Sequence, residues 1–220
     1  MRPEDAALAA RAGADAIGMV FHPPARRNVS LEQAQAIVAA LPVFVTPVAL
    51  FVDADPGRIC QVCHGLGISH VQLNGHEPPQ LIRELAPLRV IKSVPVVAES
   101  FEADLATWRQ TIDRLNLSNL AGLVLETANT GAPGGSGVAN DWATVVRAQE
   151  GGHFAGLPPI IAAGGLTPES VADVVTTLRP FAVDVSSGVE HALGQKSPHK
   201  IDAFVAAVHA ADAAASSGSS

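Results

Sequence analysis

Two glycine-rich turns in the last third of the sequence carry residues that suit a phosphate group. The first, IIAAGGLTPES, contains Gly164 and Gly165, and the second, VDVSSGVEHALG, contains Ser187 and Gly188. Glycines let the backbone approach a ligand closely, and free N–H groups and hydroxyls are donors for an anion. One such turn also serves ordinary chain reversal, but two in succession, each after an apolar run, predict a phosphate cradle.

A carboxyl group ends another apolar run, LVLETANTGAPGGSG, where Glu126 stands. Partial removal from water raises the pKa of a carboxyl, which can then act as a general acid; otherwise Glu126 is a solvated residue that starts a loop. Asp184 ends the apolar run before the second turn. Its carboxylate can either bind sugar hydroxyls or order that turn. The glycine-rich loop at 131–137 is expected to be a lid or to line a pocket.

Basic and amide side chains follow earlier apolar runs. Arg26 and Arg27 lie in HPPARRNVS, where an arginine can clamp a carboxylate bidentately or belong to a solvated basic loop. VQLNGHE places Gln72 and Asn74 after another run. Lys92, within VIKSV, invites a Schiff-base interpretation, but we expect it to snorkel or to be ion-paired.

The two cysteines, Cys60 and Cys63, form CQVCH. This is literally a c-type haem attachment motif, and C-x-x-C also occurs in redox sites. The segment DPGRICQVCHGLG instead has the apolar spacing of a helix, and haem attachment requires export, for which no signal segment is seen. We therefore expect structural cysteines on an outer helix.

Short β-branched runs alternate with amphipathic stretches, which is typical of a parallel α/β fold. The helix starts carry N-cap residue types, Ser30, Thr167 and Ser197, and the last two are followed by proline. The predicted strands are 17–21, 48–52, 70–73, 90–94, 122–126, 159–163 and 181–185. The predicted helices are 3–12, 31–41, 55–66, 79–85, 101–115, 141–149, 168–178 and 198–208.

The first predicted helix has no strand before it, although every helix of a βα repeat follows a strand. One added strand gives eight βα units, so we predict an α/β fold of the TIM (β/α)8 barrel type, with strand 1 missing from the sequence. A doubly wound open sheet is the alternative, but it would want a glycine-rich first turn. Barrel chemistry lies at the C-terminal ends of the strands and phosphate binds after strands 7 and 8, which is where the residues above are predicted to lie.

Composition limits the class of partner. The net charge is −7 and the sequence pI about 5.5, so no basic stripe is available for nucleic acid. Hydrophobic residues make up 48%, and no signal peptide or membrane span is seen, so we expect a cytoplasmic protein without a membrane partner. We predict one domain over residues 1–209 and a disordered Ala/Ser-rich tail over 210–220; the oligomeric state is left open.

Several motifs together resemble the phosphoribosylanthranilate isomerase family of tryptophan biosynthesis. They are VQLNGHE, the GGSG-x-x-x-DW loop, IIAAGGLTPESV, VDVSSGVE and GQKSPHKI, with RPEDA-x-x-A-x-x-AGADAIGMVF and HPPARRNVS early in the chain. The resemblance runs over nearly the whole chain, with the motifs in order. It implies a small-molecule substrate, an N-glycoside of anthranilate and ribose 5-phosphate, and an Amadori rearrangement that uses neither cofactor nor metal.

The resemblance also implies residue roles. Arg27 matches the arginine that holds the anthranilate carboxylate, and Glu126 stands where the family's general acid is an Asp. The extra methylene could move the acid by about 1 Å, a misplacement that can cost roughly 10²-fold in rate. We count Gln72 and Asp184 as substrate-binding from their positions. The phosphate turns are matched by Gly164, Gly165, Ser187 and Gly188.

The family's general base has no match in this sequence. The resemblance implies a Cys within K-x-C-G-[IL]-T, which we expect on the missing strand 1. In VQLNGHE, Asn74 replaces a usual His. Two other functions stay open. One is a barrel that binds phosphosugars without isomerising them. The other is an epimerase barrel, which would need metal-ligand His and Asp residues at strand ends, and no such set is seen.

Overall fold

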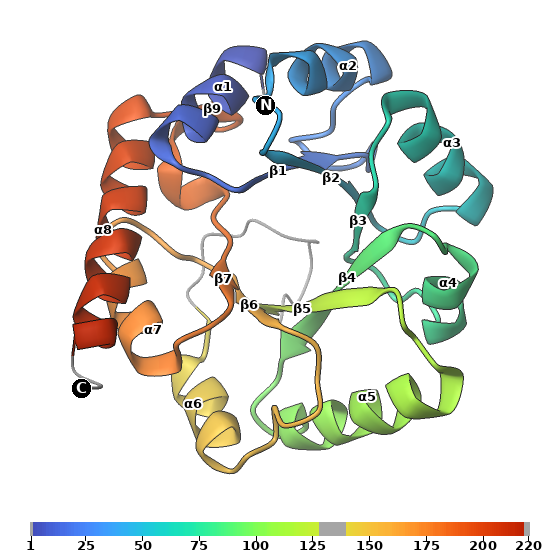
Figure 1. The fold of residues 1–220 in the computed structure, drawn as a ribbon, viewed down its shortest axis with the longest axis vertical. Helices are drawn as coiled ribbons and strands as arrows, with labels where there is room; N and C mark the ends of the chain where they lie inside the picture. Colours follow the sequence, from blue (N-terminus) through green and yellow to red (C-terminus); the bar gives the residue numbers. More distant parts are fainter. Residues whose placement is uncertain (1, 128–139, 218–220) are drawn as a thin grey trace.

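The chain forms a curved sheet of seven parallel strands that is surrounded by helices, as the computed structural model shows (Figure 1). The structure describes residues 2–127 and 140–217. Neighbouring strands pair in chain order from first to last, and each is followed by a helix on the outside of the sheet. The strands are β1 (Ala16–Val20), β2 (Thr46–Phe51), β3 (His70–Leu73), β4 (Arg89–Val96), β5 (Leu120–Thr127), β6 (Ile160–Ala162) and β7 (Ala182–Val183).

The helices begin and end at recognisable signals. Ser30 caps its helix through a hydrogen bond of 3.1 Å from the backbone N–H of Gln33, and Gly13 ends the first helix with a φ of 113° that favours glycine. The helices are α1 (Pro3–Ala12), α2 (Leu31–Ala40), α3 (Pro56–Leu66), α4 (Pro79–Glu84), α5 (Phe101–Leu115), α6 (Trp142–Glu150), α7 (Val171–Leu178) and α8 (Pro198–Ser217). None of the helices in the described ranges is long and apolar enough to cross a membrane.

Within the described residues, β2 is the one strand that pairs with β1, which also makes an isolated bridge from Val20 to Asn28, and β6 is the one strand that pairs with β7. These two strands are the edges of the curved sheet. The helix layer nevertheless continues across the opening. There α8 packs against α1, where a Cβ added at Gly13 would lie 3.3 Å from Cγ1 of Val205 (Figure 1). The prediction of a TIM-barrel type of fold is confirmed, and the described part of the chain supplies seven of its strands.

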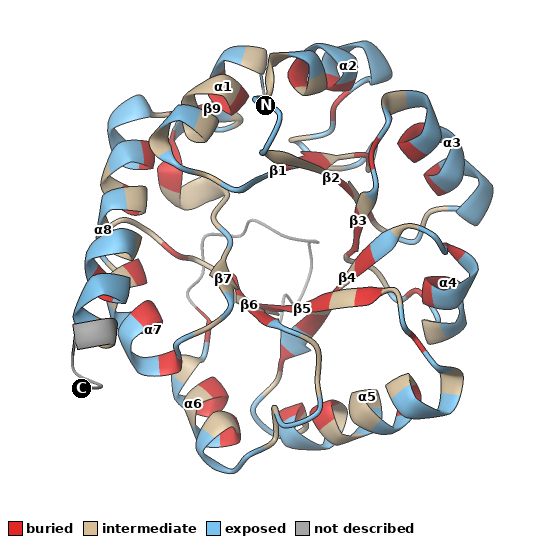
Figure 2. Cartoon of the chain, viewed as in Figure 1, coloured by how far each residue is buried: buried red, intermediate tan, exposed pale blue. Residues whose placement is uncertain are grey.

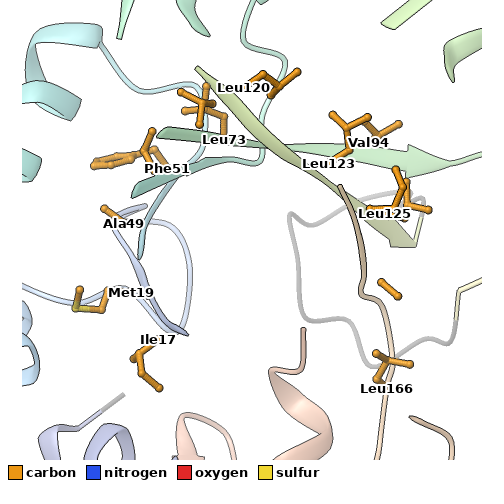
Figure 3. Packing of buried hydrophobic residues seen from close by; sticks show 14 of the residues in the cluster. Ile17, Met19, Ala49, Phe51, Leu73, Val94, Leu120, Leu123, Leu125 and Leu166 are labelled. Atoms are coloured by element: carbon orange, nitrogen blue, oxygen red, sulfur yellow. The ribbon is translucent and has the colours of Figure 1, made fainter. Parts of the chain in front are cut away.

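The main hydrophobic core lies between the strands and the helices. Side chains such as Met19, Phe51 and Leu125 are fully buried and project from the outer side of the sheet (Figure 3). Figure 2 shows the matching pattern on the helices, whose buried residues face the strands and whose exposed residues face outward. Burial of one such side chain stabilises the fold by roughly 1.5–3 kcal/mol. This packing fixes the strand ends that carry the site.

The structure departs from the sequence-based prediction in three places. A single 3-10 turn, η1 (Ser187–Val189), and a short hairpin of β8 (Glu190–Ala192) and β9 (Gln195–Lys196) follow β7, and neither was predicted. Helix α7 begins at Val171 rather than directly after Thr167, because residues 168–170 form a turn. Helix α8 continues to Ser217, so the stretch expected to be a tail from residue 210 is helical up to that point. The glycine-rich loop at 131–137 lies outside the described residues.

Candidate functional site

The carboxyl of Glu126 lies at the C-terminal end of β5. Its Oε1 accepts a hydrogen bond of 3.0 Å from Nδ2 of Asn74, and its Oε2 accepts one of 3.1 Å from Oγ of Ser93. Burial raises the pKa of Glu126 and the charge of Asp184 raises it further, while the two hydrogen bonds and the charge of Lys92 oppose the rise. The carboxyl therefore keeps its proton to a higher pH than an ordinary glutamate, which suits a general acid.

Asp184 directly follows β7, where its backbone N–H donates to the carbonyl oxygen of Ala162 at 2.8 Å. Asp184 is exposed to solvent. Neighbouring protein atoms still remove part of its hydration, which raises the pKa of Asp184 against the opposing positive charge of Lys196. The structure thus brings Asp184 within electrostatic range of Glu126, and the two like charges disfavour ionisation of both at once.

The two glycine-rich turns lie directly against each other. A Cβ added at Gly188 would collide with the carbonyl oxygen of Leu166 and lie 3.2 Å from the Cα of Thr167. Gly164 and Gly165 have φ angles of 98° and 65°, in the left-handed region that side chains rarely adopt. All these glycines are thus required by close approach or by backbone conformation, and the two turns pack against each other.

The first of these turns also contacts the end of the strand that carries Glu126. A Cβ added at Gly164 would collide with Oγ1 of Thr127, the residue after Glu126. The backbone N–H of Asn140 donates to the carbonyl oxygen of Gly164 at 3.3 Å. Ser187 begins η1 in the second turn. The candidate acid and the candidate phosphate cradle therefore belong to one end of the sheet.

Arg27, in the loop after β1, is held by Glu190 of the hairpin after β7. The guanidinium donates from Nε and from Nη2 to the two carboxylate oxygens, both at 2.8 Å. Nζ of Lys196 lies 3.5 Å from the same carboxylate and donates to the carbonyl oxygen of Ser186 at 2.7 Å. Arg26 is exposed. The bidentate carboxylate contact of Arg27 is thus made within the protein, to Glu190, through Nε and Nη2.

The amides of VQLNGHE form a short chain that leads to the acid. Gln72, which is 8% exposed, donates from Nε2 to Oδ1 of Asn74 at 2.9 Å. This contact turns Nδ2 of Asn74 toward Glu126. His76, two residues after Asn74, has an exposed side chain. Gln72 lies on the inner face of the sheet and is linked to Glu126 through Asn74.

The structure also shows the surroundings of Lys92 and of the two cysteines. Lys92 is 4% exposed and donates to Glu77 at 2.8 Å, so it is ion-paired, as expected. Cys60 and Cys63 are both free and lie on α3, and burial raises the pKa of Cys63 to about 11. In the described ranges, no group of three or more His, Cys, Asp or Glu side chains is gathered to hold a metal ion.

Sequence reasoning missed several contributors to this site. Ser93 lies one residue after Lys92 on the opposite face of β4, and its hydroxyl reaches Glu126. Glu190 and Lys196 come from a hairpin too short for a strand pattern. A polar residue inside an apolar strand run, as in VIKSV, is the one signal that could have pointed to Ser93.

Comparison with known proteins gives a consistent result. The chain matches the family described as N-(5'phosphoribosyl)anthranilate (PRA) isomerase over residues 1–207. It is 40% identical over 208 residues to the N-(5'-phosphoribosyl)anthranilate isomerase of Pseudomonas syringae pv. tomato, covering 94% of this chain and 93% of the relative. It is 38% identical over 211 residues to that of Halorhodospira halophila, covering 96% and 94%.

Solved structures of the same kind also superpose on this fold. The crystal structure of phosphoribosyl anthranilate isomerase from Thermotoga maritima matches with a TM-score of 0.81 at 33% identity, covering 96% of this chain and 95% of that one. A second structure is a complex with reduced 1-(O-carboxyphenylamino)-1-deoxyribulose 5-phosphate. It matches with a TM-score of 0.78 at 33% identity, covering 95% and 94%.

Proposed function

The chain belongs to the N-(5'-phosphoribosyl)anthranilate isomerase family, and from this premise we propose how its residues take part in that reaction. The function is the isomerisation of N-(5-phosphoribosyl)anthranilate to 1-(2-carboxyphenylamino)-1-deoxyribulose 5-phosphate. The observation that carries the assignment of roles is the position of Glu126. Its carboxyl has a raised pKa and lies at the strand ends beside the two joined glycine turns.

In the first step, Glu126 donates its proton to the ring oxygen of the furanose. The bond between that oxygen and C1 breaks, and the nitrogen lone pair forms a C=N bond, so the product is a protonated Schiff base. Glu126 is then a carboxylate, which the donors of Asn74 and Ser93 stabilise. These hydrogen bonds are stronger to the charged carboxylate than to the neutral acid, so they favour proton release.

In the second step, a general base removes the proton from C2. The C1–C2 double bond forms as the nitrogen recovers its electron pair, and the enolamine then tautomerises to the aminoketose. We assign this base to no described residue, since both cysteines lie on α3.

The other predicted residues bind the substrate. We assign the phosphate to the turns of Gly164–Gly165 and Ser187–Gly188, which pack against each other and whose backbone N–H groups are donors for an anion. We assign the anthranilate carboxylate to the Nη1 end of Arg27, since Glu190 already engages Nε and Nη2. Asp184 is assigned to the sugar hydroxyls.

Turnover and binding together test these roles. Turnover is followed by the loss of anthranilate fluorescence, and binding by calorimetry with the reduced product analogue. Glu126→Gln should bind as the parent does but lose at least about 10²-fold in turnover, because an amide cannot donate the proton. Glu126→Asp should keep turnover, and Glu99→Gln, on the exposed surface, is the matched control.

The same measurements separate a second candidate function, a barrel that binds phosphosugars without isomerising them. It is favoured by Glu126, which stands where the family's general acid is an Asp. Binding without detectable turnover in the parent would support this second function. Parent-like turnover in Glu126→Gln would show that another group is the acid.

A further inference from the structure

A buried ion pair lies beside the site, and the proposed reaction does not use it. Nζ of Lys92, on β4, lies 2.8 Å from Oε2 of Glu77 in the loop between β3 and α4. The two side chains are only 6% and 2% exposed. The ammonium also donates to the carbonyl oxygens of Leu73 at 3.0 Å and Gly75 at 2.7 Å, so all three of its N–H groups have acceptors. Both charges lose much of their solvation on folding, so the pair adds little net stability and a geometric role explains it better.

Glu77 ties this loop to the end of β2. Its Oε1 accepts from the backbone N–H of Asp53 at 3.0 Å, and both of its oxygens lie 3.0 Å from the backbone N–H of Gly75. Asp53 has a φ of 47°, and its own Oδ1 accepts from the backbone N–H of His76 at 2.6 Å. A Cβ added at Gly75 would collide with Asp53. The loop of residues 74–77 is therefore fixed to β2 on one side and to β4 on the other.

The fixed loop presents Asn74 to the acid. The backbone N–H of Asn74 donates to the carbonyl oxygen of Phe51 at 2.9 Å, and its Nδ2 donates to Glu126 at 3.0 Å. Ser93, the neighbour of Lys92, donates to the other oxygen of Glu126. Ser93 thus contacts the Glu126 carboxyl directly, and Lys92, the residue before it on β4, acts on that carboxyl through the loop.

We propose that the Lys92–Glu77 ion pair is a positioning device that holds Asn74 against the Glu126 carboxyl. Its link to catalysis rests on the proposed role of Glu126 as the acid, but the positioning itself does not. A donor at 3.0 Å stabilises the ionised carboxylate, so the device favours release of the proton once it has been used. Both Lys92 and Glu77 are positioning residues, since neither touches Glu126 in a hydrogen bond among those of the described residues.

The substitution Glu77→Gln separates this proposal from a simple charge effect, because the two effects have opposite signs. The charged groups that face Glu126 are Lys92 and Asp184. Removal of the Glu77 charge leaves Lys92 uncompensated, which by itself lowers the pKa of Glu126. Release of the loop removes the hydrogen bond from Asn74, which raises that pKa by about one pH unit, the equivalent of one hydrogen bond to a charged group.

The experiment is a titration of the side-chain carboxyl carbons of 13C-glutamate-labelled protein by NMR, with the Glu126 signal assigned by its loss in Glu126→Gln. An upward shift of the Glu126 pKa in Glu77→Gln is expected. In an Asn74→Ala background the same substitution should no longer shift it upward. A downward or absent shift in Glu77→Gln would overturn the proposal, as would an upward shift that persists without Asn74. The titration needs no turnover, so it succeeds or fails independently of the proposed function.

Two further variants keep the test decisive. Glu77→Asp retains the charge but shortens the side chain, so it should also raise the pKa of Glu126, and it decides the matter if Glu77→Gln does not fold. Asn119→Ala is the control for lost stability. The Asn119 amide donates to the carbonyl oxygens of Ile82 at 2.6 Å and Leu88 at 3.0 Å, just before β4 begins. It should lower the thermal midpoint and leave the titration of Glu126 unchanged.

Discussion

Arg27 and Glu190 join the two edge regions of the sheet, although 163 residues separate them in the chain. Arg27 follows β1, and Glu190 belongs to the hairpin after β7, and these are the strands that do not pair with each other in the described part of the chain. The two 2.8 Å hydrogen bonds form a planar fork. This ion pair therefore connects the edges of the sheet at the end where the candidate site lies.

Glu190→Gln should destabilise the protein. The substitution leaves Arg27 and Lys196 near a neutral amide, and loss of one partner of a buried ion pair costs about 3 kcal/mol or more. The side chains of Arg27 and Glu190 are 19% and 7% exposed, so solvent screens the pair little. Urea denaturation at pH 7 measures the change, with Glu99→Gln as the surface control. An unchanged free energy of unfolding would show that the ion pair does not hold the edges together.

The stability difference between the parent and Glu190→Gln should depend on pH. Burial alone would raise the pKa of Glu190, but the hydrogen bonds from Arg27 and the charges of Lys196 and Arg27 together lower it below its ordinary value of 4.5. The native state then binds fewer protons than the unfolded chain, so this stabilisation is present above pH 4.5 and is lost as the pH falls through the native pKa. The stability difference between parent and Glu190→Gln should shrink below pH 4.5, and a constant difference would contradict this.

Gly188→Ala should damage the proposed phosphate cradle. The added methyl group would collide with the carbonyl oxygen of Leu166, and such overpacking typically costs 1–3 kcal/mol. Separation of the two turns should also weaken phosphate binding by about 10-fold, the equivalent of one lost hydrogen bond to a charged group. Calorimetry with inorganic phosphate measures the loss. Gly65→Ala is the control, because nothing lies within 4 Å of its added Cβ on the surface of α3. Unchanged phosphate affinity in Gly188→Ala would place the anion elsewhere.

The secondary structure was largely predictable because its signals are local. The observed bounds of α5 (Phe101–Leu115) and β3 (His70–Leu73) equal the predicted ones, since each has a clear apolar pattern and a clear stop. The two glycine-rich turns were also predictable, because each follows an apolar run in the sequence. The hairpin of β8 and β9 was not, because strands of three and two residues show no periodicity.

The long-range pairs of the site could not be read from the sequence. Nothing near Arg27 indicates that Glu190 is its partner, because that contact depends on the closure of the whole fold. The ion pair of Lys92 was easier to predict from the sequence. A lysine in a buried strand needs a partner, and the acidic Glu77 follows the neighbouring strand. Register between strands, which sets such partners, is fixed by packing rather than by local sequence.

The pH dependence of Glu126 should have the opposite sign to that of Glu190. Burial, then the charge of Asp184, raises the pKa of Glu126 above 4.5, so the native state binds more protons than the unfolded chain. Its contribution is favourable below pH 4.5 and is lost as the pH rises through the native pKa. Relative to the parent, Glu126→Gln should therefore gain stability as the pH rises from 4.5 through the native pKa, as urea denaturation at a series of pH values would measure. A difference that falls over this range would show that the carboxyl is not destabilised by its surroundings.

Gly18→Lys should reduce aggregation without loss of stability. In the described part of the chain, Gly18 lies in the edge strand β1, before the bridge of Val20 with Asn28. Gly18 is exposed, and nothing lies within 4 Å of an added Cβ. An unpaired strand edge can pair with another chain, and an inward-pointing lysine on such a strand opposes this through charge and desolvation. Light scattering on heating should show slower aggregation at an unchanged thermal midpoint.

Gly122→Lys, in the middle of the sheet, is the contrasting variant, because its added Cβ would lie 3.3 Å from Cδ1 of Ile161 and from the carbonyl oxygen of Pro159. That variant should lower the midpoint. Equal aggregation of Gly18→Lys and the parent would show that the edge of β1 is not the surface through which chains associate.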